Sequence, residues 1–146
     1  MFTKKSLSET ITALLVFLFL YTGLSKYVEF ESFRVTLHQS PLLANFSKAI
    51  AVSLPGLEIL VTLLLILPKT RRTGFVISFC ILTIFTGYLI YMIRTDPNLP
   101  CTCGGVIAKM SWPQHVIFNI FFLALTGVGL FLERADGTTR PLATSK

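Results

Sequence analysis

Two of the three cysteines in the chain, Cys101 and Cys103, stand one residue apart in the segment PCTCGG at positions 100–105. A disulfide between residues this close departs from the preferred torsions, and the resulting strain makes the bond easier to exchange. Exchange requires one sulfur to be a thiolate that attacks a partner's disulfide. The two glycines supply the backbone freedom that a tight turn needs. The pair is therefore the candidate catalytic site, of the kind used by a thiol–disulfide oxidoreductase.

Two other interpretations of the cysteine pair remain open. The pair can form a structural disulfide that only fixes a turn. It can also bind Cu(I), a soft metal that prefers thiolate ligands, with His115 as a further ligand. A tetrahedral zinc site needs four ligands, which this segment does not supply, and we assign no metal ligand from the sequence.

Glu58, Lys26 and His115 are candidates for tuning this chemistry. Glu58 lies inside an apolar stretch, where a carboxylate is costly and normally faces the interior of a helix bundle. Lys26, at the outer end of the preceding stretch, is its candidate partner. The pair can handle protons beside a thiol or a quinone, or it can act only as a lock between helices. His115 shares a helix face with Asn119, and a histidine there is more often a satisfied polar group than a ligand.

The elements that must position these residues are apolar. The 146 residues are 53% hydrophobic and only 14% charged, whereas soluble domains carry roughly 25% charged residues. Four apolar stretches, at about 7–25, 43–67, 74–93 and 113–132, each approach the ~20 residues of a spanning helix. Backbone amides in lipid must be bonded within their own segment, so these stretches predict helices. We expect an all-α integral membrane four-helix bundle over residues 1–134 and a polar tail at 135–146.

Three features predict how the bundle meets its surroundings. The connection at about 26–42 alternates apolar and charged residues, which predicts a short amphipathic helix at the membrane interface that ends near Pro41. Trp112 stands just before the fourth stretch and predicts an interfacial anchor. Cys80, inside the third stretch, predicts a small buried packing residue.

The distribution of the basic residues predicts the orientation of the bundle. Lys and Arg lie between the apolar stretches and form no basic stripe with aromatic residues, so the net charge of +6 does not indicate nucleic-acid binding. Eight of them fall on the side of the two termini and five on the other side. The richer side is expected to be cytoplasmic, which places both termini inside and Cys101 and Cys103 outside. In a bacterial inner membrane that outside is the periplasm, where disulfides persist.

Three different short motifs follow one another along the chain: YTGLSK at 21–26, LPGLE at 54–58 and CTCGG at 101–105. With this layout the chain resembles the MauE/DoxX family of small four-helix membrane proteins, from about residue 7 to residue 132. The resemblance implies a redox-associated protein, and in the methylamine-utilisation branch a role in maturing a periplasmic dehydrogenase subunit. That branch tends to show CGC followed by FG, where this chain has CTC followed by GG. Quinone-linked disulfide enzymes also use four-helix bundles, but they usually shuttle electrons through two cysteine pairs, so a complete thiol-to-quinone circuit is not supported.

We therefore predict a multi-pass inner-membrane protein that contacts the lipid bilayer and exchanges disulfides through Cys101 and Cys103. Its partner would be a periplasmic thioredoxin-like protein or a client whose disulfides need forming or correcting. The alternative is a non-catalytic subunit of a larger membrane complex, in which a loop disulfide fixes a docking surface.

Overall fold

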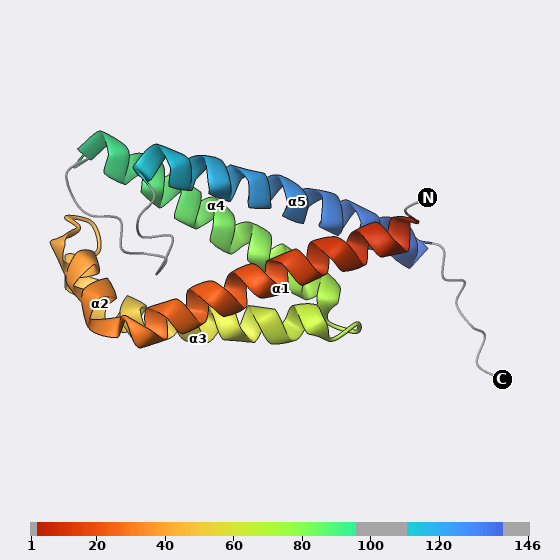
Figure 1. Cartoon of the computed structure of the whole chain (residues 1–146), viewed down its shortest axis with the longest axis horizontal. Coiled ribbons are helices and arrows are strands. Elements are labelled where there is room, and N and C mark those ends of the chain that lie inside the picture. Colours follow the sequence, from red (N-terminus) through yellow and green to blue (C-terminus); the bar gives the residue numbers. More distant parts are fainter. Residues whose placement is uncertain (1–2, 96–110, 139–146) are drawn as a thin grey trace.

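The computed structural model describes residues 3–95 and 111–138, and every regular element in these parts is a helix. Four of the helices are long and apolar enough to cross a membrane, with mean hydropathies from 1.7 to 2.3. The predicted all-α fold with four candidate membrane spans is therefore confirmed. In chain order the elements are α1 (Lys4–Val28), α2 (Phe30–Gln39), the short 3₁₀ helix η1 (Ala44–Phe46), α3 (Ser47–Ile66), α4 (Arg71–Thr95) and α5 (Trp112–Thr138) (Figure 1).

Local sequence signals explain where several of these helices begin and end. Thr3 caps α1, because its side-chain oxygen accepts a hydrogen bond of 3.3 Å from the Ser6 N–H. Pro113 stands in the first turn of α5, where the missing proline N–H leaves no bond unmade. The short helix predicted before Pro41 is present as α2, which ends at Gln39. At the other end of the chain, α5 continues to Thr138 and so extends past the expected start of the tail.

The four long helices pack in the order α1, α3, α4, α5, with α5 returning to α1. Figure 1 shows that the α1–α3 pair diverges from the α4–α5 pair toward one end of the bundle. We call this the open end; it holds α2, the last turns of α4 and the first turns of α5. The start of α1, the turn between α3 and α4 and the last turns of α5 meet at the opposite, closed end (Figure 1).

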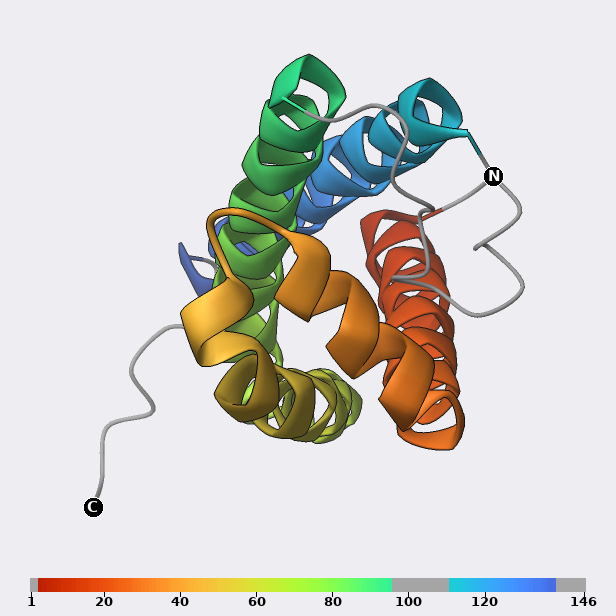
Figure 2. The same cartoon turned by 90° about the vertical axis from the view of Figure 1, so that its left-hand side faces the viewer.

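α2 lies across the open end, from the end of α1 toward α4 (Figure 2). Only Glu29 separates α1 from α2. At the other end of α2, the Ser40 Oγ donates to the Met92 Sδ of α4 at 3.6 Å. Phe33 and Leu37 face inward from α2 and pack with Ala51 of α3. α2 is therefore attached to both diverging helix pairs.

Tight apolar packing holds the closed end together. Phe75 and Leu65 are fully buried there, in a cluster that includes Ile11 of α1. A Cβ atom on Gly129 would collide with the Phe75 ring. α4 and α5 therefore approach closely only because residue 129 carries no side chain.

The outer surface of the bundle is apolar, as a surface in contact with lipid must be. Large side chains such as Phe17, Ile117 and Phe131 are exposed on it. Cys80 is exposed too, so its predicted burial is wrong. Gly74, Phe75, Ser78 and Leu82 form the packed side of α4, and Cys80 lies outside that set.

Candidate functional site

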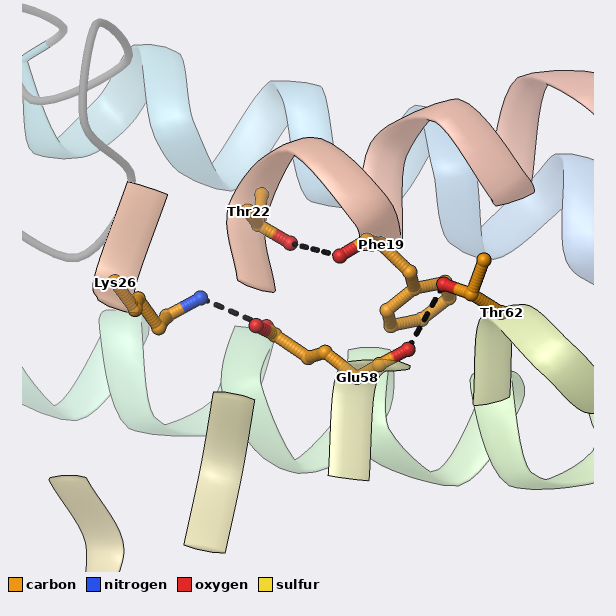
Figure 3. A network of polar contacts seen from close by, with 5 residues as sticks. All are labelled: Phe19, Thr22, Lys26, Glu58 and Thr62. Atoms are coloured by element: carbon orange, nitrogen blue, oxygen red, sulfur yellow. Dashed lines mark hydrogen bonds and ion pairs between the residues drawn. The ribbon is translucent and has the colours of Figure 1, made fainter. Parts of the chain in front are cut away.

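A buried ion pair joins α1 to α3 near the open end. The Lys26 Nζ lies 2.7 Å from the Glu58 Oε1, and the two side chains are only 4% and 7% exposed (Figure 3). A charge at this depth is strongly unfavourable without a partner. The partner that the sequence suggested for Glu58 is therefore the one that it has.

Gly23 of α1 faces Pro55 and Glu58 of α3 where the two helices pack. A Cβ atom on Gly23 would lie 3.4 Å from the Glu58 Cβ and 3.5 Å from the Pro55 carbonyl oxygen. These are ordinary van der Waals distances, so a Cβ atom would fit here, whereas a longer side chain would press on Glu58. The glycine of the YTGLSK motif thus faces the proline and the glutamate of the LPGLE motif.

The second carboxylate oxygen of Glu58 is buried without a hydrogen-bond partner. The Thr62 hydroxyl donates to the Glu58 carbonyl at 2.9 Å (Figure 3). The Thr22 hydroxyl lies within reach of the Glu58 carboxylate but donates to the Phe19 carbonyl, at 3.4 Å. Glu58 therefore has one oxygen occupied by Lys26 and one oxygen that can still accept a hydrogen bond.

The cap helix α2 shields the charge of Lys26. The Nζ atom lies 5.8 Å from the centroid of the Phe33 ring, a distance at which a cation is attracted to the face of an aromatic ring. Phe33 itself is fully buried. The helix predicted as an interfacial cap therefore covers the ion pair.

His115 and Asn119 lie in the first turns of α5, and both are buried. The His115 ring meets the Phe85 ring of α4 edge to face, with centroids 5.7 Å apart. The Asn119 Nδ2 has no hydrogen-bond partner. Trp112, one turn before His115, is buried against Leu89 and Met92. Trp112 is therefore covered by α4, and its role as an interfacial anchor stays a prediction.

These polar residues line a common cavity of about 550 Å³ at the open end. Lys26 and Glu58 face it from the α1–α3 side, and His115 and Asn119 face it from α5. Most of the remaining lining is apolar and comes from all five α-helices and from the connection between α2 and η1. The structure thus places His115 in the lining of the same cavity as the Lys26–Glu58 pair.

The cysteine pair lies outside the described residues, between Thr95 and Ser111. The helices that flank it, α4 and α5, end and begin at the open end, where the cavity lies (Figure 1). Within residues 3–95 and 111–138, no group of three or more His, Cys, Asp or Glu side chains is arranged to hold a metal ion.

Sequence reasoning missed the cavity and the place of Asn119 in its lining. An amide four residues after a histidine in an apolar helix was the only available signal for Asn119. The divergence of the two helix pairs, which creates the space, has no signature in the sequence.

Comparison with known proteins gives one match. A family model described as methylamine utilisation protein MauE matches residues 4–132. No curated protein and no solved structure matches the chain.

Proposed function

This chain belongs to the MauE family of multi-pass membrane proteins, and from that premise we propose that it exchanges thiols and disulfides through Cys101 and Cys103. The proposed site is the periplasmic face of a bacterial inner membrane, with both termini in the cytoplasm. The proposed partner is a thioredoxin-like protein or a client protein whose disulfides must be formed or corrected. The family's description favours a client that serves methylamine utilisation.

The observation that carries this proposal is the CTCGG sequence in the connection between α4 and α5. Both flanking helices are anchored at the open end by buried side chains such as Met92 and Trp112. Helix ends that are fixed on both sides of a short connection suit a pair of thiols that must meet a second protein. The basic residues are fewer on this side of the membrane, which supports a periplasmic position.

The exchange needs no electron carrier beyond the two proteins. A client thiolate attacks one sulfur of the Cys101–Cys103 disulfide, a mixed disulfide forms, and the displaced cysteine thiolate takes up a proton. The second client thiol then loses its proton and attacks the mixed disulfide. The client leaves with a disulfide, and the pair is left as two thiols. The reverse sequence reduces or reshuffles a client disulfide.

We assign Lys26, Glu58 and His115 to positioning and not to exchange. They line the cavity at the end of the bundle where α4 ends and α5 begins. We expect His115→Gln to change the reduction potential of the cysteine pair. Thr126→Val, which alters a buried polar residue outside the cavity on the same helix, should leave the potential unchanged.

A trapping experiment tests the proposed exchange. Cys80 is a third thiol on the outer surface of the bundle, so the experiment starts from Cys80→Ser. In that background, Cys101→Ser or Cys103→Ser should accumulate a mixed disulfide with a periplasmic protein, and the variant lacking both cysteines should not. Alkylation with a reagent that does not cross membranes should label the reduced pair from outside.

Two results would contradict the proposal. Labelling of the pair only from the cytoplasmic side would reverse its orientation and remove the oxidising compartment. A pair that resists mild thiols and traps no partner would instead support the alternative of a scaffolding subunit in a larger membrane complex.

A further inference from the structure

Two of the residues that line the cavity at the open end each carry a buried polar atom without a hydrogen-bond partner, the Glu58 Oε2 and the Asn119 Nδ2. Both residues are at least nine-tenths buried, with exposures of 5% and 4%. Buried polar groups in proteins are almost always hydrogen-bonded, and each exception calls for an explanation. In lipid the penalty for leaving such a group unbonded is several kcal/mol. Two of the three such side-chain atoms among the described residues belong to residues that line this one cavity, and the third is the Arg71 Nε at the closed end. The pairing of two unbonded groups in one cavity points to an occupant.

The two atoms require opposite chemistry from an occupant. A carboxylate oxygen only accepts hydrogen bonds, and the Glu58 Oε1 is already bonded to Lys26. An amide nitrogen only donates. An occupant that satisfies both must therefore offer a hydrogen to Glu58 and a lone pair to Asn119. A hydroxyl group, alone or beside a second oxygen, provides both.

The rest of the cavity suits an apolar body. Its volume of about 550 Å³ lies within the ~300–1,000 Å³ typical of small-molecule sites. The lining residues that are also exposed to the outside include Leu57 of α3 and Ile84 and Tyr91 of α4. The cavity therefore opens between α3 and α4, through an apolar rim on the surface that faces lipid.

We infer that this cavity binds a lipid-soluble molecule with an apolar body and a hydroxyl-bearing head, which enters from the bilayer. The head donates to the Glu58 Oε2 and accepts from the Asn119 Nδ2. Such chemistry is present both in phenols of the quinol type and in glyceride lipids with a free hydroxyl. The inference depends only on the described helices, so it stands or falls independently of the exchange chemistry of Cys101 and Cys103.

Photolabelling of the purified full-length protein in lipid nanodiscs tests this inference. The probes are a diazirine-bearing alkyl phenol, its methyl ether, and a diazirine-bearing monoacylglycerol. We expect the phenol or the monoacylglycerol to label peptides that line the cavity, and whichever does so identifies the source of the ligand. The methyl ether has no hydrogen to donate, so its saturable labelling should be about tenfold weaker than that of the phenol.

Two pairs of variants separate binding from folding. Asn119→Leu removes the donor and should reduce labelling about tenfold, whereas Thr126→Val on the same helix should not. Gly87 lines the cavity, and a Cβ atom added there meets no atom within 4 Å. Gly87→Leu should therefore fold normally and obstruct the cavity. Gly56→Leu is the matched control, because Gly56 is equally unobstructed but does not line the cavity.

Several outcomes would overturn the inference. One is equal labelling by the phenol and its ether. Another is labelling that Asn119→Leu and Gly87→Leu both leave unchanged. A third is labelling spread evenly over the outer surface, which would mean that water alone satisfies the two polar atoms. Loss of labelling in both glycine variants would point to a general disturbance of the bundle and would also count against the site.

Discussion

The two ends of the bundle each carry an ion pair between helices, but the pairs differ in burial and surroundings. At the open end, Lys26 and Glu58 meet at 2.7 Å with exposures of 4% and 7%. At the closed end, Arg71 and Glu133 lie 3.8 Å apart with exposures of 21% and 20%. The closed pair sits beside tightly packed apolar side chains, whereas the open pair borders a cavity.

The two ends also differ in how deeply they bury their polar groups. At the closed end, Glu133 also accepts a hydrogen bond of 2.8 Å from the Ser8 hydroxyl, and one side-chain atom, the Arg71 Nε, is buried without a hydrogen-bond partner. The open end holds charged and polar groups at a depth where they are costly and leaves two of their atoms unbonded. Helices that needed only to stay together would gain nothing from this arrangement, which supports a binding role for the open end.

Removing one partner of the buried pair should produce the largest effect. Lys26→Met leaves the Glu58 carboxylate buried without a counter-charge, so we expect a loss of about 3–5 kcal/mol in the free energy of unfolding. The double variant Lys26→Met/Glu58→Leu should recover stability to within about 1 kcal/mol of the unmodified protein or exceed it. Unfolding followed by circular dichroism in detergent measures both. A double variant as unstable as the single one would show that the charges themselves hold α1 to α3.

Replacing one glycine by leucine at each end of the bundle compares how tightly the two ends are packed. Gly129→Leu must displace the Phe75 ring and should destabilise the protein by about 1–3 kcal/mol. Gly87→Leu enters unoccupied space at the open end and should change stability by less than about 0.5 kcal/mol. The same unfolding assay compares them. Equal losses at the two positions would mean that the open end is packed as tightly as the closed one.

The ion pair at the closed end should contribute least. Arg71→Met removes a partly exposed pair, so we expect a loss of at most about 1 kcal/mol. Salt should reduce this loss further, because exposed charges are screened, while the loss caused by Lys26→Met should hardly change. Unfolding at low and high ionic strength tests both statements. A salt-insensitive effect of Arg71→Met would place that pair in surroundings as dry as those of Lys26 and Glu58.

A structural feature could be predicted when its physical cause is visible in the sequence. The four spans depend on the length of apolar stretches, which is directly visible in the sequence. The Lys26–Glu58 pair was foreseeable because a buried carboxylate requires a partner and few basic residues are within reach. The predicted burial of Cys80 was wrong for a physical reason. In a membrane helix both the packed side and the lipid side are apolar, so hydropathy does not identify which side faces inward.

The cavity was beyond sequence reasoning for a different reason. It arises from the angle between two helix pairs, which many small packing contacts decide together. Gly74 against Leu65 brings α4 close to α3 at the closed end, whereas a Cβ atom on Gly87 of α4, at the open end, would meet no atom within 4 Å. Asn119 could be recognised as a cavity residue only once the cavity itself was known.

The attachment of α2 at both ends has a geometric consequence. Its ten residues span about 15 Å at the rise of an α-helix, between Glu29 at the end of α1 and the contact of Ser40 with Met92. α2 is thus a rigid spacer whose length sets how far apart the two helix pairs stand. A relative with one turn fewer in this element would have its pairs drawn together by about 5 Å, leaving a narrower chamber for a smaller guest.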